Sequence, residues 1–365
     1  MTESFGIASF ADAKVSIVIS NYNYEDYVVA TIESALALDW PNKEVIVVDN
    51  GSTDQSRKSI AAFGDRVIAI FKEHDEQYTG VNTGFARATG EVVILLDSDD
   101  TLEPNILREV AKHWTPATTK AQVLMQTIDG QGNPLGSIFP QIRVAPSPDD
   151  IAKWQRETGF YPTPPASGNI YTRKMLEQIF PLSDQGTPFS DAYCIAAAPL
   201  YGDVVTVTQP LCRYRVHGRN DGAMVGLNVE RIRRDLERGI ATYEFARRTA
   251  ERRGVVMSRA APWNSLWLLP YRVASWKLDP AAHPVPREGL FRLLGDTLRA
   301  CLTPQGHGRT SLALAVWVTA SAVLPRSLSR HVLLWRFAPQ SRPRFLQDLM
   351  ARLGVLRRGG QRSPA

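Results

Sequence analysis

Cysteine is scarce in this sequence, and its N-terminus carries no recognisable secretion signal. The 365 residues include three cysteines, Cys194, Cys212 and Cys301, and no Cys-x-x-Cys pair. An odd number of widely spaced cysteines leaves one unpaired in any disulfide scheme, which favours a reducing compartment and argues against a zinc site. The stretch MTESFGIASFADAK has no basic start followed by an apolar core, so we expect no signal peptide and a cytoplasmic protein.

Long apolar runs are missing as well. The longest uncharged run, 310–325, has 16 residues, fewer than the roughly 20 that a helix needs to span a bilayer. Two interpretations remain open. The run forms a buried helix, or it forms a helix in the interface of a membrane, because arginines flank it.

Acidic residues are few in the second part of the chain. Residues 1–225 have a net charge of −10 and residues 226–365 one of +15, which gives +5 for the whole sequence. A basic segment of this kind can meet nucleic acid, an anionic membrane or an acidic partner. We expect an anionic membrane surface, at the inner face of the membrane, and no nucleic acid.

Two common nucleotide-binding motifs are absent. No G-x-G-x-x-G follows the first expected strand, and no G-x-x-x-x-G-K-[ST] occurs anywhere. The sequence therefore has neither a dinucleotide fingerprint nor a P-loop. A bound nucleotide would have to be held in another way.

The first half of the chain does contain a regular alternation of apolar runs and helical patterns. Four short runs rich in β-branched residues predict strands buried on both faces, at 15–20, 44–49, 66–71 and 91–97. Helical patterns lie between them. This order predicts an α/β fold with a doubly wound, mostly parallel sheet.

Polar side chains follow three of these runs. Asn21 and Asn23 come after the first run, Asp49 ends the second, and the fourth ends in the sequence Asp97-Ser98-Asp99-Asp100. Because ligands of doubly wound sheets bind at the carboxyl ends of the strands, we expect a crevice lined with carboxylates and amides. Two carboxylates one residue apart favour Mg²⁺ or Mn²⁺, which would bridge to a diphosphate. A solvated acidic turn is the alternative.

The rest of the chain is less regular at first and then helical. Residues 130–190 are rich in proline, with aromatic residues among them, and predict an ordered binding loop. Two further strands are expected at 203–208 and 211–216. The basic region 226–365 is expected to be a helical extension, with one helix that places Ile232, Leu236, Ile240 and Tyr243 on one stripe and two more at 286–301 and 311–337.

Several stretches of the first 220 residues resemble the family 2 glycosyltransferases, which have the GT-A fold. The stretches are VSIVISNYNYEDYVVATIESAL, EVIVVDNGSTDQS, NTGFARATGEVVILLDSDDTLEP and YRVHGRN. The resemblance implies a catalytic domain at 1–225, with a nucleotide-sugar half (1–110) and an acceptor half (111–225). Residues 226–365 lie outside the resemblance and would form a separate basic helical region that could associate with a membrane.

The resemblance also implies contacts with a nucleotide-sugar donor, whose nucleotide would be UDP, GDP or dTDP. Asparagines and a tyrosine after the first strand would surround the base and ribose, the aspartate after the second would hydrogen-bond the base, and other residues would lie along the sugar nucleotide. The implied donor-contacting residues are Asn21, Tyr22, Asn23, Asp49, Asn82, Gly84, Asp97 and Ser98.

A metal site is implied in the same way. Asp97 and Asp99 resemble the DxD element of the family, in which Asp99 would bind the metal directly and Asp97 would contact the ribose or the metal-bound waters. His217 in YRVHGRN resembles a histidine that reaches the metal or the diphosphate. Arg215 and Arg219 beside it could neutralise phosphate charge.

The catalytic base is expected on the acceptor side. Members of the family usually carry Glu-Asp before a helix there, and the chain has FSDAYC. Asp191 matches the aspartate, whereas Ser190 stands where the glutamate is usual. We therefore predict Asp191 as the general base, with a role at the start of the helix as the alternative.

The features together predict a metal-dependent, inverting, non-processive glycosyltransferase. The QxxRW motif of processive synthases is absent. The acceptor would be a glycan or a lipid-linked glycan in the synthesis of surface polysaccharides. The alternatives are an inactive binding module for nucleotide sugars or carbohydrates, and a sugar-nucleotide pyrophosphorylase. The pyrophosphorylase would need a loop rich in glycine and lysine after the first strand, which SNYNYED is not.

Overall fold

The chain folds into two compact units in a computed structural model that describes residues 4–75, 77–182, 190–218, 226–305, 310–338, 341–344 and 348. The first unit comprises residues 1–152 and 163–216, and the second comprises residues 153–162 and 217–365. The domain boundary expected after residue 225 adjoins the segment 219–225, which lies outside the described residues.

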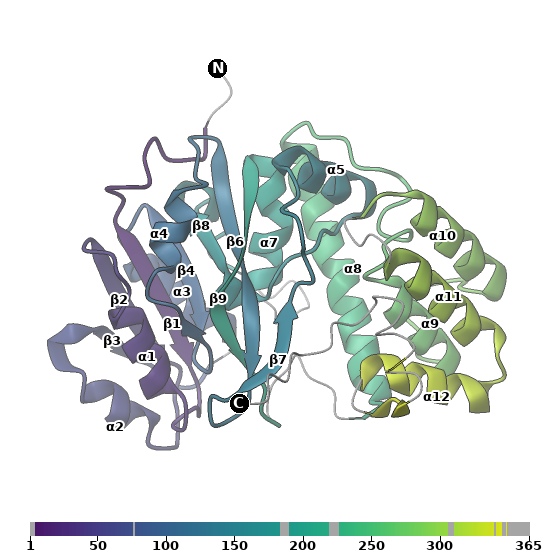
Figure 1. The fold of residues 1–365 in the computed structure, drawn as a ribbon, viewed down its shortest axis with the longest axis horizontal. Coiled ribbons are helices and arrows are strands. Elements are labelled where there is room, and N and C mark those ends of the chain that lie inside the picture. Colours follow the sequence, from purple (N-terminus) through teal and green to yellow (C-terminus); the bar gives the residue numbers. More distant parts are fainter. Residues whose placement is uncertain are drawn as a thin grey trace, which may run out of the picture. The chain divides into compact units, whose positions relative to one another are not determined.

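The first unit is built on a nine-stranded sheet (Figure 1). The order along the sheet is β3-β2-β1-β4-β8-β6-β9-β5, and β7 pairs with β6. The strands are β1 (Val15–Asn21), β2 (Lys43–Asp49), β3 (Ile68–Phe71), β4 (Val92–Asp97), β5 (Thr101–Leu102), β6 (Thr118–Ile128), β7 (Pro134–Phe139), β8 (Asn169–Thr172) and β9 (Asp203–Arg215).

The four predicted apolar runs form the parallel half of this sheet. β1 pairs in parallel with both β2 and β4, and β2 pairs in parallel with β3. The other half is mixed, because β8 runs antiparallel to β4 and β6 whereas β9 runs parallel to β6. The α/β class is confirmed, and the parallel pairs lie among β1–β4 and between β6 and β9.

Residues 203–215 differ from the expectation, since they form the single strand β9 and not two strands. The pairing with β6 shifts in register between Val207, opposite Val123, and Pro210, opposite Leu124. Proline lacks the N–H that a regular ladder needs, so the irregularity falls at Pro210. The strand continues past this bulge without a turn.

The predicted binding loop is also replaced by regular structure over much of its length. Helix α5 (Pro148–Thr158) and the strands β7 and β8 lie within 130–190. Phe160 stacks on Trp267, with ring centroids 4.8 Å apart, and Tyr161 is buried. Phe160 and Tyr161 both belong to the second unit, so they do not form the expected binding loop beside the sheet of the first unit.

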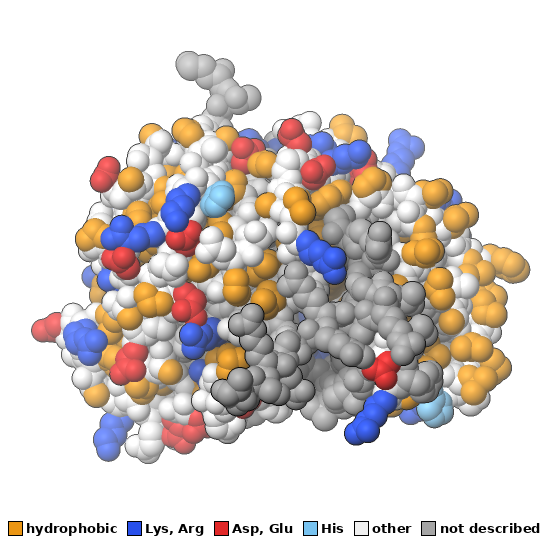
Figure 2. All heavy atoms as spheres, in the orientation of Figure 1, with side chains coloured by type: hydrophobic (Ala, Val, Ile, Leu, Met, Phe, Trp, Pro, Cys, Tyr) orange, Lys and Arg blue, Asp and Glu red, His pale blue; other side chains and the backbone are white. Residues whose placement is uncertain are grey.

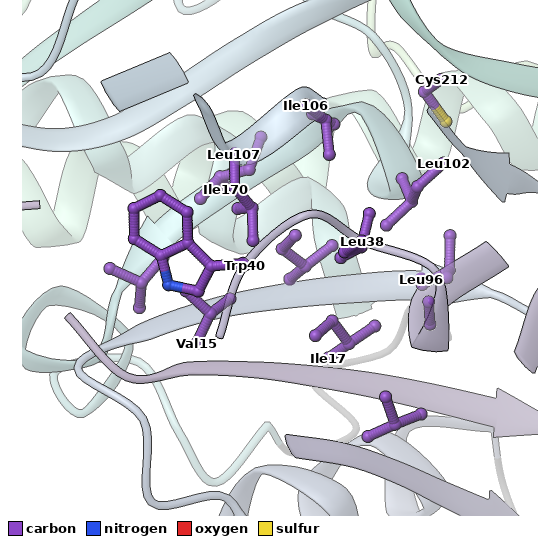
Figure 3. Close-up of a cluster of buried hydrophobic side chains, with 14 of the residues drawn as sticks. Val15, Ile17, Leu38, Trp40, Leu96, Leu102, Ile106, Leu107, Ile170 and Cys212 are labelled. Atoms are coloured by element: carbon purple, nitrogen blue, oxygen red, sulfur yellow. The ribbon is translucent and has the colours of Figure 1, made fainter. Parts of the chain in front are cut away.

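Helices cover both faces of the parallel strands, as the doubly wound pattern requires. Val15 and Ile17 point to one face, where they join a core with Ile32 and Ile106 (Figure 3). On the other face, Val18 packs closely against Gly84 on α3. The helices of this unit are α1 (Val28–Leu36), α2 (Ser56–Ala61), α3 (Gln77–Arg87), α4 (Ile106–Ala111), α6 (Arg173–Leu176) and α7 (Ser190–Tyr201), with 3₁₀ turns η1 (Gly64–Arg66) and η2 (Ala166–Gly168).

The second unit is helical. Its helices are α8 (Val229–Arg252), α9 (Leu269–Leu278), α10 (Leu290–Leu302), α11 (Thr310–Val323) and α12 (Arg326–Phe337). The predicted stripe on α8 faces the core: Ile232, Leu236 and Tyr243 are buried, and Ile240 is partly buried against Leu236 and its neighbours. The single helix expected at 311–337 is wrong. It is two helices, because proline at 325 lacks the N–H that would continue the helix.

A buried ion network holds the second unit together. The guanidinium of Arg272 is inaccessible to solvent and pairs with Glu288 and Asp296, at 2.8 and 2.9 Å. It also lies over the ring of Trp263. Removing one partner of such a network leaves a buried charge uncompensated, so these groups fix how α9 and α10 pack. Among the described residues, no helix has the length and apolar character to cross a membrane.

One carboxylate of the sheet makes stability depend on pH. Burial alone would raise the pKa of Glu44, but hydrogen bonds from Lys14, Ser16 and Thr89 outweigh it and lower the pKa from 4.5 to about 2. The folded-state pKa lies below the unfolded one, so this stabilisation is present above about pH 4.5 and is lost as the pH falls towards 2.

We predict that Glu44→Gln lowers the free energy of unfolding by about 1–2 kcal/mol at neutral pH and by clearly less at about pH 3. Urea unfolding of both proteins at the two pH values measures the difference. An equal loss at both values would show that ionised Glu44 is not what stabilises this edge of the sheet.

Candidate active site

The polar residues at the ends of β1, β2 and β4 meet at one edge of the sheet. The register places Asn21 opposite Asp49, and Ser20 opposite Asp97. The edge is the carboxyl end of the parallel strands, where doubly wound sheets bind ligands. Residues far apart in the sequence thus form a single candidate site.

Three carboxylates crowd the end of β4. Asp99 is almost fully buried and Asp100 is fully buried. Burial raises the pKa of Asp97, and the charges of Asp100, Asp99 and Asp191 raise it further. Burial and then the charge of Asp99 raise the pKa of Asp100 in the same way. The crowding therefore favours any positive charge that can reach these oxygens.

The backbone of this acidic turn is held by two side chains from other elements. Thr31 on α1 donates its hydroxyl to the carbonyl oxygens of Ser98 and Asp100, at 2.9 and 2.8 Å. Arg215, at the end of β9, donates from Nε to the carbonyl of Asp99 at 2.8 Å. The two contacts fix the backbone of the turn, and the backbone N–H of Arg215 also donates to Asp100 Oδ1 at 3.0 Å.

Arg215 has a different position from the one expected beside a phosphate. It is buried, it lies over the ring of Tyr27, and its NH1 faces the carbonyls of Asp129 and Gly130. Its guanidinium thus orders the acidic turn and a neighbouring hairpin. Arg219, the other expected phosphate partner, lies outside the described residues.

Asp191 lies in the first turn of α7, close enough to Asp97 for its charge to raise the pKa of that residue. Burial raises the pKa of Asp191 itself, whereas the backbone N–H groups of Asp191, Ala192 and Ala166 lower it. The residue as a whole is partly exposed. Backbone N–H groups at the start of α7 and in the turn before β8 therefore hold the carboxylate of Asp191.

The turn η2 joins Asp191 to the acidic strand end. The backbone N–H of Asp97 donates to the hydroxyl of Ser167, at 3.1 Å, and the N–H of the preceding residue, Ala166, faces Asp191. One short turn therefore sets the positions of both groups. Sequence reasoning missed Ser167, because a serine in a proline-rich stretch carries no signal of this role.

A buried lysine lies close enough to Asp191 for their charges to interact. Lys120 on β6 donates from Nζ to Gln122 and Thr163, both at 2.9 Å. Burial lowers the pKa of Lys120, and the charge of Asp191 opposes this. Sequence patterns could not predict its burial, since a lysine inside a strand normally marks an exposed position.

A second network orders the loops after β1 and β2. Asn21 donates from Nδ2 to Asp49 Oδ2 at 3.0 Å, and the N–H of Ser52 donates to Asp49 Oδ1 at 3.0 Å. Asn23, in a left-handed conformation, accepts from the N–H of Thr53. Asp49 is fully buried and both of its oxygens are engaged, so its contact with a base remains a prediction.

Tyr22 is the exposed member of this group. Its ring stacks on that of His74, with centroids 4.2 Å apart and an angle of 19°. His74 in turn contacts the carbonyl of Asn50 through Nδ1 at 3.1 Å. The pair forms an accessible aromatic surface at the carboxyl ends of the strands, which suits the flat face of a base.

Asn82 and Gly84 on α3 serve packing in this structure. Asn82 exchanges two hydrogen bonds with the backbone of Leu182, at 2.7 and 2.8 Å. A Cβ at Gly84 would lie 2.3 Å from Val18, so α3 approaches β1 closely only because this residue is glycine. Their predicted contacts with the sugar nucleotide remain predictions.

The metal set expected from the sequence is not assembled as a group of three. Among the residues that the structure describes, no three or more His, Cys, Asp or Glu side chains are arranged to hold a metal ion. His217 lies just beyond β9 and is partly buried, in the segment assigned to the second unit. Its role as a ligand remains a prediction, as does that of Asp97 and Asp99.

The sequence of the first unit matches a known protein family. Residues 16–180 match the family model "Glycosyl transferase family 2". This match spans the parallel strands, the acidic turn and the turn η2. The chain therefore carries a domain of glycosyl transferase family 2, and its sheet has the α/β architecture that the GT-A resemblance implied.

Curated relatives are similar over more than half of the chain. An uncharacterized glycosyltransferase from Nostoc is 34% identical over 216 residues, which are 57% of this chain and 66% of that protein. The succinoglycan biosynthesis protein ExoO from Rhizobium meliloti is 28% identical over 228 residues, 60% of this chain and 64% of that protein. About a third of each relative lies outside the similarity.

Two solved structures align more distantly. Staphylococcus aureus TarS 1-349 in complex with UDP-GlcNAc has 16% identity and a TM-score of 0.47, over 85% of this chain and 90% of that chain. The mannosyltransferase PcManGT from Pyrobaculum calidifontis in complex with GDP-Man and Mn2+ has 15% identity and a TM-score of 0.48, over 94% of this chain and 89% of that chain.

We predict that Gly84→Ala destabilises the first unit by about 1–3 kcal/mol, because the added methyl group collides with Val18. Thermal unfolding with and without nucleotide tests this. The affinity for a nucleotide, measured on the fraction that remains folded, should be close to that of the wild type. A stable variant with greatly weakened affinity would instead support the donor contact.

Proposed function

We propose that the chain is a metal-dependent, inverting, non-processive glycosyltransferase. It would transfer a sugar from a nucleotide-diphosphate donor to a hydroxyl group. The observation that carries the proposal is the close placement of Asp191 and the three carboxylates of the β4 end, joined through η2. One group of carboxylates suits the diphosphate side of a transfer, and the separate carboxylate suits the acceptor side.

The residues at the end of β4 fit a divalent cation that is shared with a substrate. Asp100 Oδ2 is buried and has no hydrogen-bond partner among the described residues. Asp97 and Asp99 supply the hard oxygen ligands that Mg²⁺ and Mn²⁺ prefer, and both ions commonly complete their shell with phosphate oxygens and water. When bound, the cation would supply positive charge that stabilises the departing diphosphate.

The chain's own residues would then have distinct tasks. Tyr22 and His74 would offer a face for the base, and Thr31 and Arg215 would keep the acidic turn in place. As the acceptor oxygen bonds to the anomeric carbon, the bond from that carbon to the diphosphate oxygen breaks, and Asp191 takes the proton of the acceptor hydroxyl. A single displacement inverts the anomeric centre.

Two considerations support the proposed acceptor, namely the hydroxyl group that the transfer requires and the name of one relative. The name of the Rhizobium relative links it to succinoglycan biosynthesis, which supports a role in the synthesis of a surface glycan. A glycan or lipid-linked glycan hydroxyl would be the acceptor. The protein would be cytoplasmic and peripheral at the inner face of the membrane, where lipid-linked acceptors are found.

We predict that Asp99→Asn abolishes Mn²⁺-dependent nucleotide binding and leaves the fold intact. Removing one charge from a crowded group relieves repulsion, so the variant without ligand should be no less stable than the wild type. Calorimetric titration of UDP, GDP and dTDP with Mn²⁺ measures the affinity. Asp65→Asn, at an exposed position in η1, is the matched control. Unchanged affinity in Asp99→Asn would refute the metal site.

We predict that Asp191→Asn lowers kcat by about 10²–10⁴ and leaves donor affinity nearly unchanged, because the base acts on the acceptor. Asp203→Asn, in a residue at the start of β9, is the control and should retain turnover. Near-full turnover by Asp191→Asn would contradict the assignment. Binding of donor by the wild type without any turnover, over a panel of acceptors, would instead identify a binding module.

A further inference from the structure

Helix α10 exposes a stripe of large apolar side chains. Phe291, Leu298 and Leu302 are 88%, 63% and 77% exposed. They are spaced by seven and four residues, so they project from one side of the helix. The opposite side is buried, with Leu293 and Ala300 in the core of the second unit. Both sides of this helix are therefore apolar, although only one is covered.

Helix α11 repeats this arrangement. Leu312, Val316 and Val323 are 68%, 62% and 58% exposed, and their spacing again places them on one side. Val318 and Ala322 occupy the buried side. This is the run 310–325 for which the sequence left two interpretations open, and the structure gives it one buried and one exposed apolar side.

The two stripes form one surface. α10 packs along α11, and both helices contact α9. Since their buried residues join the core that α9 contributes to, the exposed stripes of both helices face away from it. We call this surface the apolar face. Figure 2 shows hydrophobic side chains gathered at the edge of the molecule where Figure 1 places α10 and α11.

The charge around the apolar face is of one sign. Residues 290–337 include six arginines and a single acidic residue, Asp296. Asp296 is buried and pairs with Arg272 and Arg299. Over the described residues of this stretch, the surface therefore presents arginines and no exposed carboxylate. Arg330 on α12 is one of the exposed arginines.

We propose that the apolar face docks on the surface of an anionic lipid bilayer. Aliphatic and aromatic side chains would enter the boundary between headgroups and acyl chains, and the surrounding arginines would contact the lipid phosphates. A second copy of this chain is a poorer occupant, since pairing two such faces would bring two arginine-rich rims together. The inference rests on the peripheral membrane placement in the proposed function and names the surface responsible for it. Docking is measured without a donor, so its failure can be distinguished from a failure of sugar transfer.

The chain offers a natural position for a probe. Cys301 on α10 is exposed and lies beside Leu302, whereas Cys194 and Cys212 are buried. A thiol-reactive, polarity-sensitive fluorophore on Cys301 of the full-length protein should shift to shorter wavelength with mixed phosphatidylcholine–phosphatidylglycerol vesicles. Vesicles of phosphatidylcholine alone should give little change, and salt should reverse the shift. No shift with the anionic vesicles at low salt would overturn the proposal.

Matched variants locate the docking surface. The double variant Phe291→Ser, Leu298→Ser should bind the anionic vesicles about ten- to a hundredfold more weakly, since two large side chains no longer leave water. Val256→Ser removes an equally exposed apolar side chain from a loop of the same unit and should change nothing. Arg330→Gln should weaken binding more than Arg87→Gln, whose arginine lies on α3 of the first unit.

Two results of these variants would overturn the proposal. The first is unchanged vesicle binding by the double variant at wild-type thermal stability. The second is a concentration-dependent dimer of the wild type that the double variant abolishes in sedimentation, because the apolar face would then be an interface between copies of this chain.

Discussion

Three carboxylates, those of Asp97, Asp99 and Asp100, lie within four residues at the end of a strand that is otherwise apolar and buried. Burial raises the pKa values of Asp97 and Asp100, and repulsion between these closely placed carboxylates raises them further. The fold keeps the groups in place through the backbone, by way of Thr31 and Arg215. The backbone N–H of Arg215 also donates to Asp100 Oδ1, and the negative charge that remains on the group favours a positive charge that the substrate brings.

The neighbouring turn and loops position the other candidate residues around these three carboxylates. The turn η2 links the acidic strand end to Asp191, so that the candidate base and the candidate metal ligands share one support. The network around Asp49 orders the loops after β1 and β2 and leaves the stacked rings of Tyr22 and His74 accessible. We propose a separate role for the helical unit, whose apolar face would dock on a membrane surface where a lipid-linked acceptor could be presented.

Sequence patterns predicted the parallel strands β1–β4 because each is a short apolar run, and three of the four are followed by polar residues. They missed β6, whose buried positions include Lys120 and Gln122, so its pattern does not look like that of a core strand. They also missed α9, since Arg272 is buried there through ion pairs that form only in the folded chain. Local spacing identified the acidic turn, but the contacts of Ser167, Thr31 and Arg215 depend on how distant segments come together.

Binding of a nucleoside diphosphate at the acidic turn should depend on a divalent cation. Titrations of UDP, GDP and dTDP, and of the corresponding nucleosides, would be compared in Mn²⁺ and in a chelator. We predict that Mn²⁺ strengthens binding of at least one diphosphate tenfold or more, which is about 1.4 kcal/mol of coupling, and leaves the nucleoside unaffected. Equal affinities with and without Mn²⁺ for every diphosphate that binds would contradict it.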